Sequence, residues 1–96
     1  MTEKRLTEAR RLAKKILPKV QKMQRDMYFN NHVSVSIDFS SIGYSFYVTV
    51  IHVNDKNDRS EKPSFKIFSF YVFYDAEEND ETFKRLAEYV NEKSAS

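Results

Sequence analysis

Apolar side chains recur at alternating steps of three and four residues along the first third of the chain. The positions are Leu6, Ala9, Ala13, Ile16, Val20, Met23 and Met27. This spacing puts them on one side of an α-helix, and Leu12 and Leu17 widen the stripe to an arc of roughly 140°, which is typical of a helix that lies on a sheet. Pro18 removes one helical hydrogen bond, but the apolar spacing continues unchanged across it. We therefore predict one kinked helix over residues 6–27, with Thr2 as a candidate N-cap.

Apolar and polar residues then alternate strictly over residues 32–40. The apolar positions are Val33, Val35, Ile37 and Phe39. This period predicts a strand with one buried and one wet face. A turn containing Gly43 leads to a second strand over residues 44–53. Antiparallel pairing in which the numbers of facing residues sum to 85 or 83 keeps the apolar residues of both strands on one face, so we predict a β-hairpin.

The remainder of the chain predicts a third strand and a second helix. Residues 54–63 are polar and charged, and we expect them to form a solvated hairpin loop. Residues 64–74 form the third strand and hold six of the fourteen aromatic residues. Asp75 and Asn79 are candidate caps of a final helix, which would bury Phe83, Leu86, Ala87 and Val90. The prediction is thus a single α+β domain over residues 1–96 in α-β-β-β-α order: a three-stranded antiparallel meander with a long N-terminal and a short C-terminal helix on one face.

The second and third strands are apolar on both faces, which is more than one small core can cover. Two helices on one side of a three-stranded sheet leave the other side open. If the even-numbered residues of the third strand face inward, the open side carries a set of apolar residues that we predict to form an interface. They are Tyr47, Ile51, Phe65, Ile67, Tyr71 and Phe73. Such a patch exceeds what monomers usually leave in water.

The third strand is also an edge of the predicted meander, with one lysine and no proline to protect it. Two copies would cover this region by pairing their third strands into one sheet or by stacking their open faces. We therefore predict a homodimer, and a small non-enzymatic interaction or assembly protein. Three alternatives stay open: a helix on each side of the sheet, a face kept wet by hydroxyl groups, and aromatic side chains that stack on unpaired bases.

Charge is distributed unevenly, and it supplies an alternative function. The formal net charge is +2, but residues 1–29 alone carry +6 and the remainder carries −4. Most basic residues of the first helix fall opposite its apolar stripe, and four of them are our candidates for phosphate contact in a nucleic-acid-binding protein. These are Lys4, Arg11, Lys15 and Lys22. The alternative is that these basic residues form a solvated face, part of which contacts the acidic last helix. Double-stranded-RNA-binding domains share this element order, but they place a lysine-rich stretch where this chain has acidic residues 75–81, so no family is assigned.

Composition excludes several kinds of chemistry. The chain has no cysteine, so it cannot form disulfides or metal sites with thiolate ligands. Its single glycine is too few for a glycine-rich phosphate-binding loop. The predicted pairing sends His32 and His52 to opposite faces of the sheet. Asp55, Asn57 and Asp58 lack the glycine and the distant glutamate of a calcium loop. No run is long and apolar enough for a membrane span or a signal peptide. We expect a cytoplasmic protein that is not an enzyme, binds no cofactor and does not contact membranes.

Overall fold

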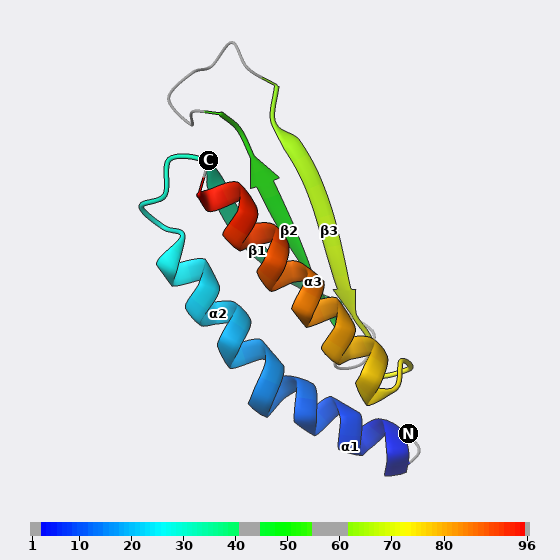
Figure 1. The fold of residues 1–96 in the computed structure, drawn as a ribbon. Helices are drawn as coiled ribbons and strands as arrows, with labels where there is room; N and C mark the ends of the chain where they lie inside the picture. The colour runs from blue at the N-terminus through cyan, green and yellow to red at the C-terminus, as the bar shows by residue number, and fades with distance from the viewer. Residues whose placement is uncertain (1–2, 41–44, 55–61, 96) are drawn as a thin grey trace.

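The computed structural model describes residues 3–40, 45–54 and 62–95 (Figure 1). It confirms the α+β class, with both helical segments on one face of an antiparallel sheet whose strand order is β1-β2-β3. The elements are α1 (Glu3–Arg11), a π-helical segment η1 (Leu12–Ile16), α2 (Leu17–Asp26), β1 (Val33–Phe39), β2 (Phe46–His52), β3 (Ser64–Phe70) and α3 (Ala76–Ser94). The predicted turn at Gly43, most of the predicted loop over residues 54–63 and the candidate cap Thr2 lie outside the described residues.

The predicted helix with an interruption at Pro18 is one continuous helical run from α1 to α2. The backbone widens to a π-helix in η1, where the N–H of Leu17 bonds to the carbonyl of Leu12. Pro18 follows directly at the start of α2. A proline ring collides with the carbonyl of the residue four positions earlier in a regular α-helix, and the wider π turn lies at that point.

The sheet-facing side of this helical run is narrower than predicted. Leu12, Ile16 and Val20 are buried in the core together with Ala9. Ala13, which we placed in the apolar stripe, is exposed. The side that packs on the sheet is centred on the buried residues, and Ala13 lies at its flank, where the sheet does not reach.

Strand pairing follows the predicted register. Val33 faces His52, so facing numbers sum to 85, and Phe46 faces Phe70 in the second pairing. The rings of Phe46 and Phe70 stack with centroids 4.8 Å apart. Phe68 and Phe70 are buried, so the even-numbered residues of β3 face the helices, which meets the condition under which the interface set was predicted.

The third strand is shorter than predicted. It ends at Phe70, and a turn closed by the bond from Tyr74 N–H to Tyr71 C=O leads into α3. Asp75 caps that helix as predicted, because its side chain accepts from the N–H of Glu78. α3 has 19 residues and is short only beside the run from α1 to α2. It buries Leu86 and Val90, while Phe83 and Ala87 are only partly covered.

Candidate interaction surface

The sheet face that points away from the helices is called the open face below. It is apolar along β3 and polar along β1. On β3, Phe65 and Ile67 are 63% and 61% exposed. Ile51 of β2 lies beside Phe65, and Tyr47, on the same face of β2, is 39% exposed. The matching positions on β1 are Ser34, Ser36 and Asp38. On the open face, the exposed apolar side chains therefore gather on the β3 side. Other exposed aromatic side chains, Tyr28, Phe29 and Phe39, lie away from this part of the sheet.

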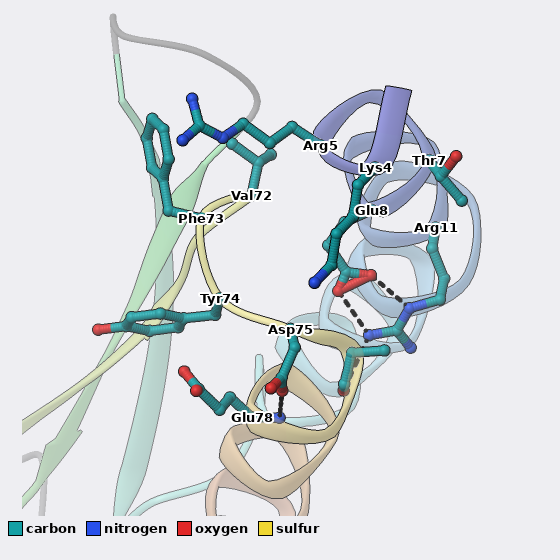
Figure 2. A pocket seen from close by; sticks show the side chains of 11 residues that line it. Lys4, Arg5, Thr7, Glu8, Arg11, Val72, Phe73, Tyr74, Asp75 and Glu78 are labelled. Atoms are coloured by element: carbon teal, nitrogen blue, oxygen red, sulfur yellow. Dashed lines mark hydrogen bonds and ion pairs between the residues drawn. The ribbon is translucent and has the colours of Figure 1, made fainter. Parts of the chain in front are cut away.

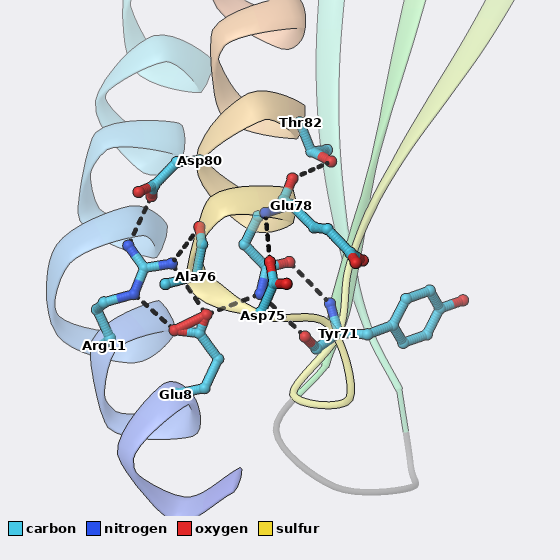
Figure 3. A network of polar contacts seen from close by, with 9 residues as sticks. Glu8, Arg11, Tyr71, Asp75, Ala76, Glu78, Asp80 and Thr82 are labelled. Carbon is cyan, nitrogen blue, oxygen red and sulfur yellow. Dashed lines mark hydrogen bonds and ion pairs between the residues drawn. The ribbon is translucent and has the colours of Figure 1, made fainter. Parts of the chain in front are cut away.

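Two of the six predicted interface residues lie past the end of β3. Tyr71 makes an edge contact with Tyr74, at 5.0 Å between ring centroids, and its ring points away from the helices (Figure 3). Phe73 lies under the guanidinium of Arg5, 4.5 Å from the ring centroid (Figure 2). The predicted set is thus divided into four residues on the sheet and two in the turn before α3.

The backbone of β3 is open along its outer edge. The bond from Val53 N–H to His32 C=O shows that the odd-numbered residues of the β2 segment bond to β1. In an antiparallel ladder the remaining residues of the middle strand bond to the other neighbour, so even-numbered residues of β3 bond to β2. The odd-numbered residues of β3 direct their N–H and C=O groups outward. They are Phe65, Ile67 and Ser69, and we call them the edge window.

The opposite edge of the sheet, on β1, is capped in part by side chains of the chain itself, at Val33 and Val35. Asn30 Oδ1 accepts from the N–H of Val33 at 2.9 Å. Gln24 Nε2 donates to the carbonyl of Val35 at 3.2 Å. Among the described residues no side chain makes such a bond to the edge window of β3. Unpaired strand edges are templates for pairing with another chain, and β3 differs from β1 in having no side-chain cap over its edge window within the described residues.

The single lysine of β3 gives the open face little protection. Lys66 is an even-numbered position and belongs to the helix side of the strand. Its Nζ lies 4.9 Å from the ring centroid of Tyr89 on α3. Because this charge is held over α3, it does not screen Phe65 and Ile67 on the other face.

A polar network closes the sheet at the end of β3. Asn79 is fully buried, and its Oδ1 accepts from the N–H of Tyr71 while its Nδ2 donates to the carbonyl of Tyr71 and to Glu8. The sequence pattern indicates Asn79 only as a candidate helix cap. Its spacing to Tyr71 carries no recognisable signal, because the contact exists only once α3 has packed beside the strand.

Arg11 joins the same network from α1 (Figure 3). It donates to Glu8, to Asp80 at 2.6 Å and to the carbonyl of Ala76 at 3.1 Å. Burial alone would raise the pKa of Glu8, but the hydrogen bonds from Arg11 and Asn79 hold that pKa below its ordinary value. The hydrogen bond to Glu8 in turn raises the pKa of Arg11 above its ordinary range.

Arg11 therefore does not belong to the exposed cationic face on which sequence analysis placed it. Its guanidinium links α1 to the acidic start of α3, which confirms the expectation that part of the basic helix meets the acidic one. The other three candidates for phosphate contact, Lys4, Lys15 and Lys22, are exposed. Lys22 pairs with Asp26 at 2.8 Å.

A pocket with a volume of about 750 Å³ lies between α1 and the start of α3 (Figure 2). Lys4 and Arg5 face it from α1, and Asp75 and Glu78 face it from the other side. Opposite charges across the same pocket offset each other, so its electrostatics favour neither an anion nor a cation. This pocket lies between the two helical segments, and its lining includes Phe73.

The two histidines lie on opposite faces of the sheet, as predicted. His52 faces Val33, whose side chain is buried in the core, and His32 is the neighbour of Val33 on β1. Within the described ranges, no three histidine or carboxylate side chains are grouped so that they could hold a metal ion.

No helix in the described part of the chain is both long enough and apolar enough to cross a membrane. Comparison of the chain with protein-family models, curated proteins and solved structures finds no match.

Proposed function

We propose that this chain is a non-enzymatic assembly protein that self-associates through β3. One observation carries the proposal: the same strand exposes large apolar side chains on the open face and unpaired backbone groups at its edge. Removing a side chain such as Phe65 or Ile67 from water contributes about 1.5–3 kcal/mol. Pairing a strand edge adds hydrogen bonds whose net contribution is about 0.5–1.5 kcal/mol each.

The asymmetry between the two sheet edges supports this assignment. Asn30 and Gln24 satisfy polar groups on the outer edge of β1, where the open face is also polar. On the β3 side neither protection is present among the described residues. Of the two sheet edges, the one on β3 therefore combines a lack of side-chain caps with an apolar open face among the described residues.

The proposal is tested by the mass of Ile67→Glu, measured by light scattering after gel filtration. Because Ile67 is largely exposed within one chain, a glutamate there leaves the fold of the single chain intact, and it places two charges in any interface that contains the strand. We expect the unmodified protein to have a mass above that of one chain and Ile67→Glu to have the mass of one chain. Ser36→Glu, on the open face of β1, is the matched control and keeps the larger mass. Equal masses for Ile67→Glu and the unmodified protein would refute the proposal.

Nucleic-acid binding by the outer face of the α1 to α2 run is the second candidate. The observation in its favour is a set of exposed cations that have no acidic side chain within ion-pair distance among the described residues. It comprises Lys4, Arg10, Lys14, Lys15, Lys19 and Arg25. Contacts of this kind lose affinity steeply as salt rises. Retention on immobilised duplex RNA that weakens with salt and is reduced by Lys15→Glu would support it, and unchanged retention would exclude this face.

A further inference from the structure

We propose that the recess between the end of α2 and the outer edge of β1 binds a nucleotide, with the ring of Tyr28 stacked on the base and the guanidinium of Arg25 on the phosphate. The recess has a volume of about 460 Å³, within the ~300–1,000 Å³ of small-molecule sites. Its lining comprises Gln24, Arg25, Met27, Tyr28, Ser34 and Val35. None of these residues belongs to β3, so the site goes beyond the proposed self-association.

Tyr28 supplies an aromatic surface, together with its neighbour Phe29. These two are the most exposed large apolar side chains among the described residues, at 75% and 87%. They lie just after α2, in the segment that loops outward before β1 (Figure 1). Their rings meet edge to face, with centroids 4.8 Å apart. This contact leaves at least one face of each ring uncovered by the other, and nucleobases stack on exposed aromatic faces.

Hydrogen bonds hold the backbone that carries the two rings. The N–H of Tyr28 donates to the carbonyl of Arg25 at 3.1 Å, and the N–H of Asn30 donates to the carbonyl of Met27 at 3.1 Å. Asn30 Oδ1 accepts from the N–H of His32 at 2.8 Å and thereby fixes the turn to the start of β1. A surface that is held in position before binding loses less conformational entropy when a ligand arrives.

Arg25 supplies the positive charge that a phosphate needs. It is exposed and makes no ion pair within the described residues. The adjacent acid, Asp26, is paired with Lys22 at 2.8 Å. Free carbonyl groups at a helix C-terminus repel anions, but the carbonyls of Arg25 and Met27 already accept hydrogen bonds. A guanidinium can form two parallel hydrogen bonds with a phosphate.

The edge of β1 supplies hydrogen-bonding groups for the base. Val33 and Val35 direct their backbone groups outward, because they bond to the side chains of Asn30 and Gln24. The carbonyl of Val35 accepts from Gln24, while its N–H points to the same edge. Gln24 Oε1 accepts no hydrogen bond from the described residues and remains an acceptor. The recess thus combines an aromatic face, a cation, a donor and an acceptor.

This combination favours a nucleotide over a membrane surface. Exposed aromatic and basic groups also suit a lipid interface, but a hydrocarbon layer cannot use the donor and the acceptor at the edge of β1. The open face of the sheet lacks the combination among the described residues, because Lys66 is held over α3. The site also gives the second candidate function a contact with bases, which the cations of the α1 to α2 run do not provide.

Binding of a short, fluorescently labelled oligoadenylate, measured by anisotropy, tests the site. Tyr28→Ser should weaken binding by about 5- to 150-fold, because the stacking of one base is lost. Tyr28→Phe retains the ring and should retain the affinity. Phe39→Ser is the matched control, since it removes a ring that is 64% exposed at the far end of β1. The fold of Tyr28→Ser remains intact because Tyr28 is mostly exposed.

Two further measurements examine the phosphate and the source of the nucleotide. Arg25→Gln should flatten the slope of log affinity against log salt by about 0.7, the effect of one lost phosphate contact to a single strand. Adenosine monophosphate is the second probe. If it binds as tightly as the oligoadenylate, the ligand is a free nucleotide, and if it binds more weakly, the ligand is an unpaired nucleotide of a strand. In both cases binding should depend on Tyr28.

The outcomes separate this inference from the other proposals. Affinity for oligoadenylate that is absent, or equal in Tyr28→Ser and the unmodified protein, overturns the site. Vesicles containing phosphatidylserine that bind the unmodified protein but not Tyr28→Ser, with oligoadenylate binding unchanged, also overturn it and assign the turn to a membrane surface. Retention on duplex RNA, whose bases are paired, should be unchanged in Tyr28→Ser, and an equal loss there overturns base stacking. Self-association is judged by Ile67→Glu and the outer helical face by Lys15→Glu, independently of these results.

Discussion

Asn79 holds both backbone polar groups of Tyr71, accepting from its N–H at 3.3 Å and donating to its carbonyl at 3.0 Å. A side-chain amide can do this because it carries one acceptor and one donor group in the order that a neighbouring strand presents. Asn79 therefore occupies the place of a neighbouring strand at this point. It ends the open edge of β3 and connects that edge to Glu8 on α1.

Replacing Asn79 with alanine should destabilise the protein strongly. The change leaves the N–H of Tyr71 without a partner, and a buried group left unpaired costs about 1–3 kcal/mol. It also removes one of the two hydrogen bonds to the Tyr71 carbonyl, which keeps the bond from Tyr74 N–H, and one of the bonds to Glu8, which keeps those from Arg11. Urea denaturation measures the loss of unfolding free energy. Asn91→Ala, at an exposed position of the same helix, should change it by less than about 0.5 kcal/mol. Equal effects of the two substitutions would contradict the role given to Asn79.

The depressed pKa of Glu8 predicts how stability depends on pH. A carboxyl whose pKa is lower in the folded than in the unfolded chain stabilises the fold above its unfolded value, and that contribution is lost as the pH falls. The loss should therefore begin near the ordinary value of 4.5 and continue as the pH falls through the folded value. In Glu8→Gln this part of the acid dependence should disappear, while Glu88→Gln, which changes an exposed carboxyl, should retain it. Urea unfolding at a series of pH values below neutrality measures both slopes, and parallel curves for the two variants would argue against the Glu8 network.

Removing the caps of the β1 edge should create a second site of association. In the double variant Gln24→Ala with Asn30→Ala, the N–H of Val33 and the C=O of Val35 lose their side-chain partners. Edge pairing at both ends of the sheet then gives species larger than a dimer, which light scattering detects as a mass that rises with concentration. Gln21→Ala with Asn31→Ala alters two exposed neighbours and should leave the mass unchanged. A double variant of Gln24 and Asn30 with unchanged mass would show that these side chains do not protect the edge.

The alternation of apolar and polar residues was sufficient to predict the sheet. Val33 and Val35 on β1 and Val48 and Val50 on β2 face the core as expected, because a strand of period two has only two faces to choose from. For β3, which is apolar on both faces, the alternation left the inward face open, and the structure places Phe65 and Ile67 on the open face. These features depend on local spacing and on one buried side of the sheet, both of which the sequence contains.

The spacing of apolar and polar residues does not predict side-chain contacts between residues far apart in the chain. The end of β3 depends on Asn79, which becomes a partner of Tyr71 only when α3 packs beside the strand. Arg11 seemed to lie on the solvated face because its partner Asp80 is 69 positions away. The capped edge of β1 went unnoticed for the same reason, since Gln24 reaches Val35 only in the folded chain.

Sedimentation equilibrium of the unmodified protein, from low to high micromolar concentration, tests self-association through β3 most directly. We predict a mass that approaches twice the chain's 11.4 kDa and that changes little with salt, because the interface is mainly apolar and backbone-paired. A mass that remains at 11.4 kDa over the whole range would contradict the account.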